Sequence, residues 1–302
     1  KRAPCLGAPG LHNAIMPQAL LDPVTAARAV HVGATALVWG VLLFRACVAW
    51  PDGARQALTR VTFGALVVAM VSGAAWLVAL SNTYDAPDGV RTLALETRFG
   101  RVMLLRGLLL VALFAALPRL RDAHAGVIDH GFLLLAAIVT GALALTGHSG
   151  ALGWSEAASD ALHLVAAGGW IGALGPLALA LRHGDAATTA RRFSTLGLAC
   201  VAAMAVTGSF NAYALAGGLP GLFGTDWGRT LLLKLALVIA MLAIAAFNRY
   251  AVTPRLATWS RAAPLLRANA LTELALGFVV IRSEEHTSEL QSRFGISYAV
   301  FC

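Results

Sequence analysis

The sequence of residues 147–175, GHSGALGWSEAASDALHLVAAGGWIGALG, decides the fold. It joins two apolar segments through a short connection that contains no Lys or Arg. His148 closes the first segment, and Asp160 and His163 lie near the start of the second. Their spacing of three residues places Asp160 and His163 on one face of a helix. Ionisable side chains inside an apolar helix are costly in a membrane, so they indicate a functional site.

The composition is that of a membrane protein. Hydrophobic residues make up 58% of the chain and charged residues 13%, whereas a soluble domain has about 25% charged residues. Mean hydropathy is +0.73, and several apolar runs reach the ~20 residues that cross a bilayer. The sequence therefore predicts an all-α, polytopic helix bundle in contact with membrane lipid. The four Cys show no paired spacing, which argues against a disulfide framework or a thiolate metal site.

The distribution of charge predicts the topology. The net charge of +8 comes mostly from Arg at helix ends, so it indicates orientation and no nucleic-acid partner. The odd-numbered connections between spans carry Arg, and the fourth carries none. By the positive-inside rule the odd connections are cytoplasmic and both ends of the bundle face outward, which in a bacterium is the periplasm. We expect eight spans, at residues 24–48, 60–80, 101–120, 127–147, 156–181, 193–216, 229–250 and 265–281.

Two halves of the chain repeat the same residues in the same order. His31 precedes Gly40 by nine residues, and His163 precedes Gly172 by nine. Two further motifs recur, Ser72-Gly73 with Thr207-Gly208 and T-x-[aromatic]-G-R-x-x-L-L-[basic] at residues 97–106 and 225–234. The offsets are 132 (31 to 163), 135 (73 to 208) and 128 (97 to 225). These nearly constant offsets predict two parallel four-helix repeats related by an axis along the membrane normal.

The repeats divide the chain into residues 24–148 and 149–281. Residues 1–23 are expected to form a disordered N-terminal extension, of which residues 1–15 precede the first Met. From Arg282 the composition changes abruptly to RSEEHTSELQSR. This string resembles translated sequencing-adapter read-through, so we interpret residues 282–302 as an artefactual tail that truncates the eighth helix. Its Glu and His residues are accordingly not interpreted as a metal site.

Four polar residues converge toward the outer side of the predicted bundle. At ~1.5 Å per residue, His31 and His163 lie about 10 Å below the outer surface, Asp160 about 6 Å, and His148 at the surface. Imidazole suits copper, zinc, iron and nickel, and a carboxylate can complete or orient the ligand set. The sequence predicts a periplasm-facing metal site of His31, His148, His163 and Asp160. For any single membrane His, an interhelical hydrogen bond is the competing interpretation.

The same residues resemble the copper resistance D (CopD) family of bacterial inner-membrane proteins. The resemblance covers residues 24–281 and is carried by Gly147-His148, Asp160-Ala-Leu-His163, Trp170-Ile-Gly172, Arg192-Phe193-Ser194, Thr207-Gly208, Gly228-Arg229 and Asn248-Arg249. It implies handling of copper ions across the inner membrane, usually uptake from the periplasm. It also implies a separate periplasmic copper-binding protein as a partner. The family does not imply an enzyme.

Two alternatives to a copper transporter remain open. In a membrane cytochrome, His31 and His163 would be the two axial ligands of one haem, although His148 and Asp160 would then have no role. In a sensor or assembly subunit, the site would bind copper without transport. No ladder of Cys or Met follows the site, which argues against a simple channel for Cu(I). The sequence leaves the oxidation state of copper and the direction of transport open.

The orientation can be tested with reporter fusions. A reporter fused after residue 185 should be active in the cytoplasm, because the fifth connection carries Arg182, Arg191 and Arg192. A reporter fused after residue 152 should be active in the periplasm. The opposite activity at either position would reject the orientation and, with it, the outer placement of the four polar residues.

Overall fold

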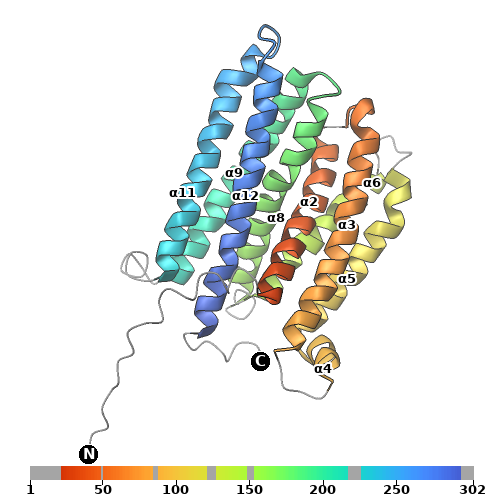
Figure 1. Ribbon diagram of the computed structural model, residues 1–302, viewed down its shortest axis with the longest axis vertical. Helices are drawn as coiled ribbons and strands as arrows, with labels where there is room; N and C mark the ends of the chain where they lie inside the picture. The colour runs from red at the N-terminus through yellow and green to blue at the C-terminus, as the bar shows by residue number, and fades with distance from the viewer. Residues whose placement is uncertain are drawn as a thin grey trace, which may run out of the picture.

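The computed structural model describes residues 22–48, 50–83, 88–120, 127–147, 153–216 and 226–293. Within these ranges the chain is helical and contains no strand. The helices run side by side along the length of the molecule (Figure 1). The predicted all-α bundle of a polytopic membrane protein is confirmed.

The first half of the chain forms the helices on one side of the bundle. They are α2 (Pro23–Cys47), α3 (Asp52–Ser81), the short α4 (Gly89–Glu96), α5 (Arg98–Ala116) with η1 (Leu117–Leu120), and α6 (Val127–Gly141) with η2 (Ala142–Thr146). The second half forms α8 (Trp154–Ala180), α9 (Ala186–Ala216), α11 (Asp226–Phe247) with η3 (Asn248–Val252) and η4 (Thr253–Arg255), and α12 (Ala262–Arg293). Helices α2 and α8, one from each half, pack against each other in the middle of the bundle (Figure 1).

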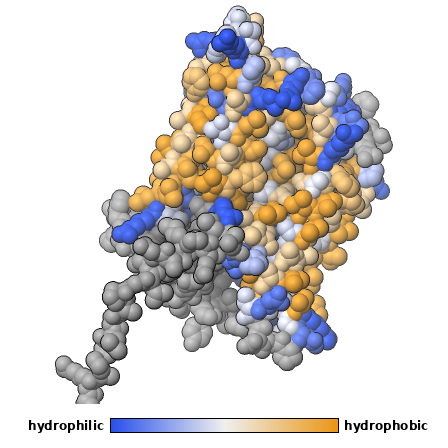
Figure 2. Space-filling model, in the orientation of Figure 1, coloured by the Kyte–Doolittle hydropathy of each residue, from blue (hydrophilic) through white to orange (hydrophobic). Residues whose placement is uncertain are grey.

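Seven helices in the described part of the chain are long and apolar enough to cross a membrane. The remaining expected span, the fourth at residues 127–147, corresponds to a shorter apolar stretch, His130–Thr146. Here the α-helix ends at Gly141 and continues as the 3₁₀-helix η2. A 3₁₀-helix rises ~2.0 Å per residue, so α6 and η2 together extend about 32 Å. Hydrophobic residues cover the middle of the bundle, and hydrophilic residues gather at its two ends (Figure 2).

Several helices are longer than their apolar segments. We expected spans to begin at residues 60 and 193, whereas α3 begins at Asp52 and α9 at Ala186. Polar residues form these extra turns. The side chain of Asp185 accepts hydrogen bonds from the backbone of Ala187 and Thr188, at 2.9 and 3.2 Å, and so caps α9. Hydropathy locates the apolar segment, but the capping residue decides where the helix begins.

The motif that begins at Thr97 has a structural role. The Thr97 hydroxyl accepts a hydrogen bond of 3.0 Å from the Gly100 amide and caps α5. Gly100 lies directly against α4, because an added Cβ would be 1.9 Å from the Leu93 carbonyl oxygen. Helix α4 itself was not predicted. The matching Thr225 lies outside the described residues, so whether it caps α11 in the same way stays a prediction.

Helix α12 continues beyond the apolar segment. Its membrane-compatible part is Ala262–Arg282, as the sequence predicts, while the helical backbone extends to Arg293. The composition of residues 282–302 still indicates an artefactual tail, although the backbone of residues 282–293 is helical. The extension at residues 1–21 lies outside the described residues.

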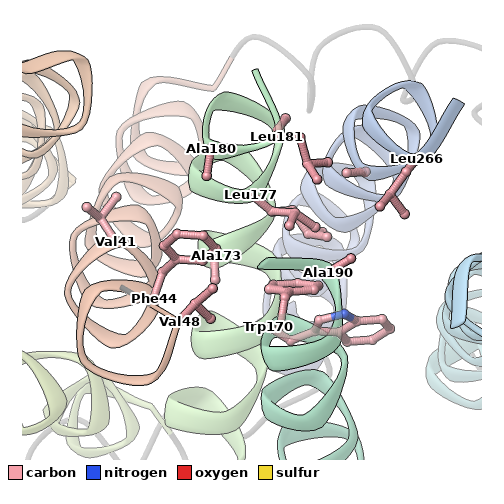
Figure 3. Close-up of a cluster of buried hydrophobic side chains, with 14 of the residues drawn as sticks. Val41, Phe44, Val48, Trp170, Ala173, Leu177, Ala180, Leu181, Ala190 and Leu266 are labelled. Atoms are coloured by element: carbon pink, nitrogen blue, oxygen red, sulfur yellow. The ribbon is translucent and has the colours of Figure 1, made fainter. Parts of the chain in front are cut away.

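The centre of the fold is the crossing of α2 and α8 at two glycines. A Cβ added at Gly40 would lie 2.1 Å from the carbonyl carbon of Gly172, and one added at Gly172 would lie 1.9 Å from the Ala36 carbonyl oxygen. Glycine is thus required for this backbone contact. Around the crossing, side chains of both helices pack with Ala190 of α9 and Leu266 of α12 into one buried apolar cluster (Figure 3).

The connections α2–α3, α8–α9 and α11–α12 lie together at one end of the bundle (Figure 1). We call it the Arg-rich end, because the connections and the helix ends next to them carry Arg45, Arg55, Arg182, Arg191 and Arg255. Helix α2 begins, and the apolar part of α12 ends, at the opposite end. The spans therefore alternate in direction as the predicted topology requires. Which end of the bundle faces the cytoplasm stays a prediction.

Substitution of Gly172 by Val should disrupt the bundle, because the new side chain would force α2 and α8 apart. We expect a loss of about 3 kcal/mol of stability or more, the cost of severe overpacking. Thermal unfolding of the purified protein in detergent measures this loss. The control is Gly64→Ala in α3, where no atom lies within 4 Å of the added Cβ. Equal unfolding temperatures for the two variants would contradict the central role of the crossing.

Candidate functional site

His31 lies on α2 in the half of the bundle away from the Arg-rich end, and its side chain is 1% exposed. Its Nδ1 is 2.8 Å from the Ala69 carbonyl oxygen on α3. A carbonyl can only accept, so Nδ1 carries the proton and donates it. The other ring nitrogen, Nε2, lies 2.8 Å from Nη1 of Arg106. Arg is always a donor, so Nε2 accepts, and His31 is a neutral imidazole with both nitrogens engaged.

Arg106 on α5 is completely buried. Besides His31, its guanidinium donates to the Val139 carbonyl oxygen on α6 at 2.9 Å. Longer contacts of 3.4 and 3.5 Å join it to Met103 Sδ and Thr35 Oγ1. Arg106 thereby connects α2, α5 and α6 through one planar group. Sequence analysis did not select this residue, although an Arg eight residues into an apolar helix was a signal for a buried polar contact.

The positive charge of Arg106 bears on metal binding at His31. No Asp or Glu lies within 4.0 Å of the guanidinium in the part of the chain that the structure describes. An unbalanced positive charge beside His31 repels a metal cation. The lone pair that would bind a metal is also occupied by Arg106. In this conformation, the Nε2 of His31 accepts a hydrogen bond from Arg106 and is not available to a metal.

His163 on α8 occupies the corresponding place in the second half of the chain and is partly exposed. Its Nδ1 is 2.9 Å from the hydroxyl of Thr207 on α9. That hydroxyl donates its own proton to the Ala203 carbonyl oxygen at 2.7 Å. It therefore accepts from His163, which places the imidazole proton on Nδ1 and the lone pair on Nε2. Among the described residues, no hydrogen-bond partner of this Nε2 is found.

The two histidines are held in matching ways. In each half a hydroxyl next to the imidazole donates to the carbonyl four residues earlier, Ser72 to Val68 at 2.6 Å and Thr207 to Ala203 at 2.7 Å. The glycine that follows makes room for the ring. A Cβ at this glycine would lie close to Cε1 of the histidine, at 2.9 Å for Gly73 with His31 and 3.2 Å for Gly208 with His163. The repeated Ser-Gly and Thr-Gly pairs thus form seats for two imidazoles.

The predicted site residues fall into two groups. Asp160 is partly exposed on α8, one turn before His163, and neighbours Ser159, whose hydroxyl donates to Asn211 of α9 at 2.7 Å. His31 instead faces α3 and α5, and none of its described contacts reaches His163. His148 lies outside the described residues. Within those residues no cluster of three or more His, Cys, Asp or Glu side chains that could hold a metal is found.

Comparison with known proteins identifies relatives along most of the chain. Residues 187–283 match the family model described as Copper resistance protein D, and residues 16–157 match Copper resistance protein D-like, N-terminal domain. The chain is 30% identical over 278 residues to "Inner membrane protein YebZ" of Escherichia coli K12, with 85% of this chain and 93% of the relative covered.

Two further relatives have names that refer to copper. "Copper resistance protein D" of Pseudomonas syringae pv. tomato is 27% identical over 236 residues, which cover 71% of this chain and 76% of the relative. "Copper transport protein CutJ" of Bacillus subtilis 168 is 29% identical over 250 residues, which cover 72% of this chain and 45% of the relative. No solved structure was found that matches the chain.

The helical bundle and its relatives define a multi-pass protein of the bacterial inner membrane. The chain belongs to the copper resistance protein D family. The resemblance inferred from the sequence motifs is thereby confirmed, and with it a copper-related membrane function.

Substitution of Arg106 by Met should destabilise the first half of the bundle. It would remove the Arg106 donor from the Val139 carbonyl and from the buried Nε2 of His31, and each such loss costs about 1–3 kcal/mol. The unfolding temperature in detergent should fall accordingly. The control is Arg101→Met, one turn closer to the start of α5, because Arg101 is exposed. An Arg106→Met protein as stable as the Arg101→Met protein would show that the His31–Arg106 contact is energetically unimportant.

Proposed function

We propose that this protein moves copper ions across the bacterial inner membrane, taking them up from the periplasmic side. The ion is the cargo, and its first ligand within the bundle is His163. Asp160 and His148 complete or orient the ligand set at the outer end of α8. A separate periplasmic protein delivers the copper.

The observation that carries this proposal is the state of the His163 ring. Metal-bound histidines usually donate their second N–H to a fixed acceptor, which sets the tautomer and orients the ring. The Thr207 hydroxyl is such an acceptor for Nδ1. A neutral imidazole with a free lone pair binds a metal without first losing a proton at pH 7. Asp160, one turn away, contributes negative charge that favours a cation.

His31 belongs to this ligand set in a second conformation only. Its Nε2 must leave Arg106 before it can bind copper, and the guanidinium must move away. The haem alternative meets the same obstacle, because an axial ligand also needs the Nε2 lone pair of His31. The geometry therefore supports copper binding at His163 better than a haem shared by His31 and His163.

Substitution of His163 by Ala should abolish copper retention, because it removes the ligand with a free lone pair. Copper bound per protein after gel filtration measures the effect. His130→Ala is the control, since His130 is an exposed histidine on α6 near the Arg-rich end. Unchanged copper content in His163→Ala would reject the proposed ligand.

The His31→Ala protein separates two versions of the site. Loss of copper in His31→Ala but not in Arg106→Met, which breaks the same His31–Arg106 contact, would place His31 among the ligands. Retained copper would restrict the site to α8 and the connection before it. Copper uptake into vesicles that contain the wild-type protein then distinguishes a transporter from a copper-binding sensor.

A further inference from the structure

A second buried polar group lies toward the Arg-rich end, in the second half of the chain. Glu273 on α12 is 2% exposed. It is eleven residues from the start of the helix at Ala262, about 16 Å along the axis and so near mid-membrane. Its Oε1 accepts a hydrogen bond of 2.9 Å from Nδ2 of Asn248. The Oδ1 of Asn248 in turn accepts one of 2.6 Å from Asn269.

This contact depends on a local change in helix type. At Asn248 the α-helix α11 becomes the π-helix η3, Asn248–Val252. A π-turn adds a residue to the turn and redirects the side chains that follow, and such turns are frequent at functional sites. Asn248 is buried at 8% exposure, whereas Phe247 before it and Tyr250 after it are exposed. At the start of this π-helix, the Asn248 amide thus points inward and donates to the Glu273 carboxyl group.

Glu273 and Asn248 line a cavity of about 200 Å³ between α8, α9, α11 and α12. The cavity is mostly apolar and lies toward the Arg-rich end, where Ala190 and Leu266 border it near the starts of their helices. Besides Glu273, the charged or titratable groups among its described lining residues are Arg249 and Tyr250 of η3. Arg249 donates a hydrogen bond of 2.5 Å to the hydroxyl of Ser194 on α9. Helix α8 contributes the indole of Trp170 to the described lining of the cavity.

No Lys, Arg or His lies within 4.0 Å of the Glu273 carboxyl in the described ranges. A buried carboxylate without a cationic partner is very costly, so the group holds either a proton or a metal cation. Two observations favour the proton. The described residues that line the cavity include no His, Cys or Met, the usual protein ligands of copper, and the Arg249 guanidinium on the same cavity repels any added cation. A proton, by contrast, forms an O–H bond and leaves the carboxyl uncharged.

We propose that Glu273 is a proton-binding site that exchanges with water at the Arg-rich end and couples the movement of copper to the pH on that side of the membrane. The proton comes from water that enters the cavity and forms an O–H bond on Oε2, the oxygen that Asn248 does not contact. On release it returns to water at the same end. The coupling rests on the proposed transport function, whereas proton binding does not.

Infrared spectroscopy of the purified full chain in lipid tests proton binding directly. The carbonyl band of a protonated carboxylic acid should be present, shift on transfer to D₂O and disappear at high pH. The Glu273→Gln protein should lack this band. Glu96→Gln, which changes an exposed carboxyl at the end of α4, should keep it. A wild-type spectrum without such a band, or a band that remains in Glu273→Gln, would overturn the proposal.

Copper flux into proteoliposomes tests the coupling. When the pH on the Arg-rich side is changed, the flux of wild-type and Glu96→Gln proteins should change several-fold, and that of Glu273→Gln should not respond. An equal response in Glu273→Gln would overturn the coupling. If the wild-type protein carries no copper under any gradient, the transport function fails, while the infrared result still decides whether Glu273 binds a proton. The Asn248→Ala protein, in which the carboxyl is kept but its donor is lost, should retain the band at a shifted frequency.

Discussion

The backbone contact between Gly40 and Gly172 is the constraint on which the rest of the structure depends. It brings α2 and α8 together at the centre, where a single methyl group on either glycine would collide with the other helix. The remaining helices pack around this pair, α3 on α2 and α9 on α8. The two glycines are also equivalent positions in the predicted repeat. Contact between equivalent positions is what an axis that relates two halves produces, because the axis must pass between them.

The crossing also explains why two histidines nine residues from these glycines receive matching surroundings. Each imidazole donates from Nδ1 toward the neighbouring helix of its own half and rests on a glycine of that helix. The difference lies at Nε2. In the first half Arg106 occupies it, whereas the predicted repeat places Lys234 at the corresponding position of the second half. In the first half the His31–Arg106 contact therefore holds α2, α5 and α6 together. In the second half the Nε2 of His163 has no hydrogen-bond partner among the described residues.

The sequence predicts those parts of the structure that depend on local patterns. Apolar runs locate the helices, and the spacing of His31 and His163 places both in the half of the bundle away from the Arg-rich end, because these properties follow from hydropathy and helical rise. The orientation of a ring is different. Whether the His31 ring faces a metal or Arg106 depends on how α5 packs against α2. The spacing of residues within α2 carries no information on that packing. The same holds for Asn248, since its inward direction accompanies a π-helix without a sequence signature. The helix α4 was missed because eight residues are too few to show a period.

The distribution of buried charge differs between the two halves of the bundle. A cation that crosses the first half would meet the buried guanidinium of Arg106, which no acidic group within 4.0 Å balances in the described ranges. Moving a positive charge past it in a low-dielectric interior is strongly unfavourable. The second half has Asp160 near one end of its helices and Glu273 near the middle. These carboxyl groups lower the cost for a cation near them, while the Arg249 guanidinium on the Glu273 cavity raises it. The buried His31–Arg106 contact therefore stabilises the first half, whereas the buried or partly buried carboxyl groups are found in the second.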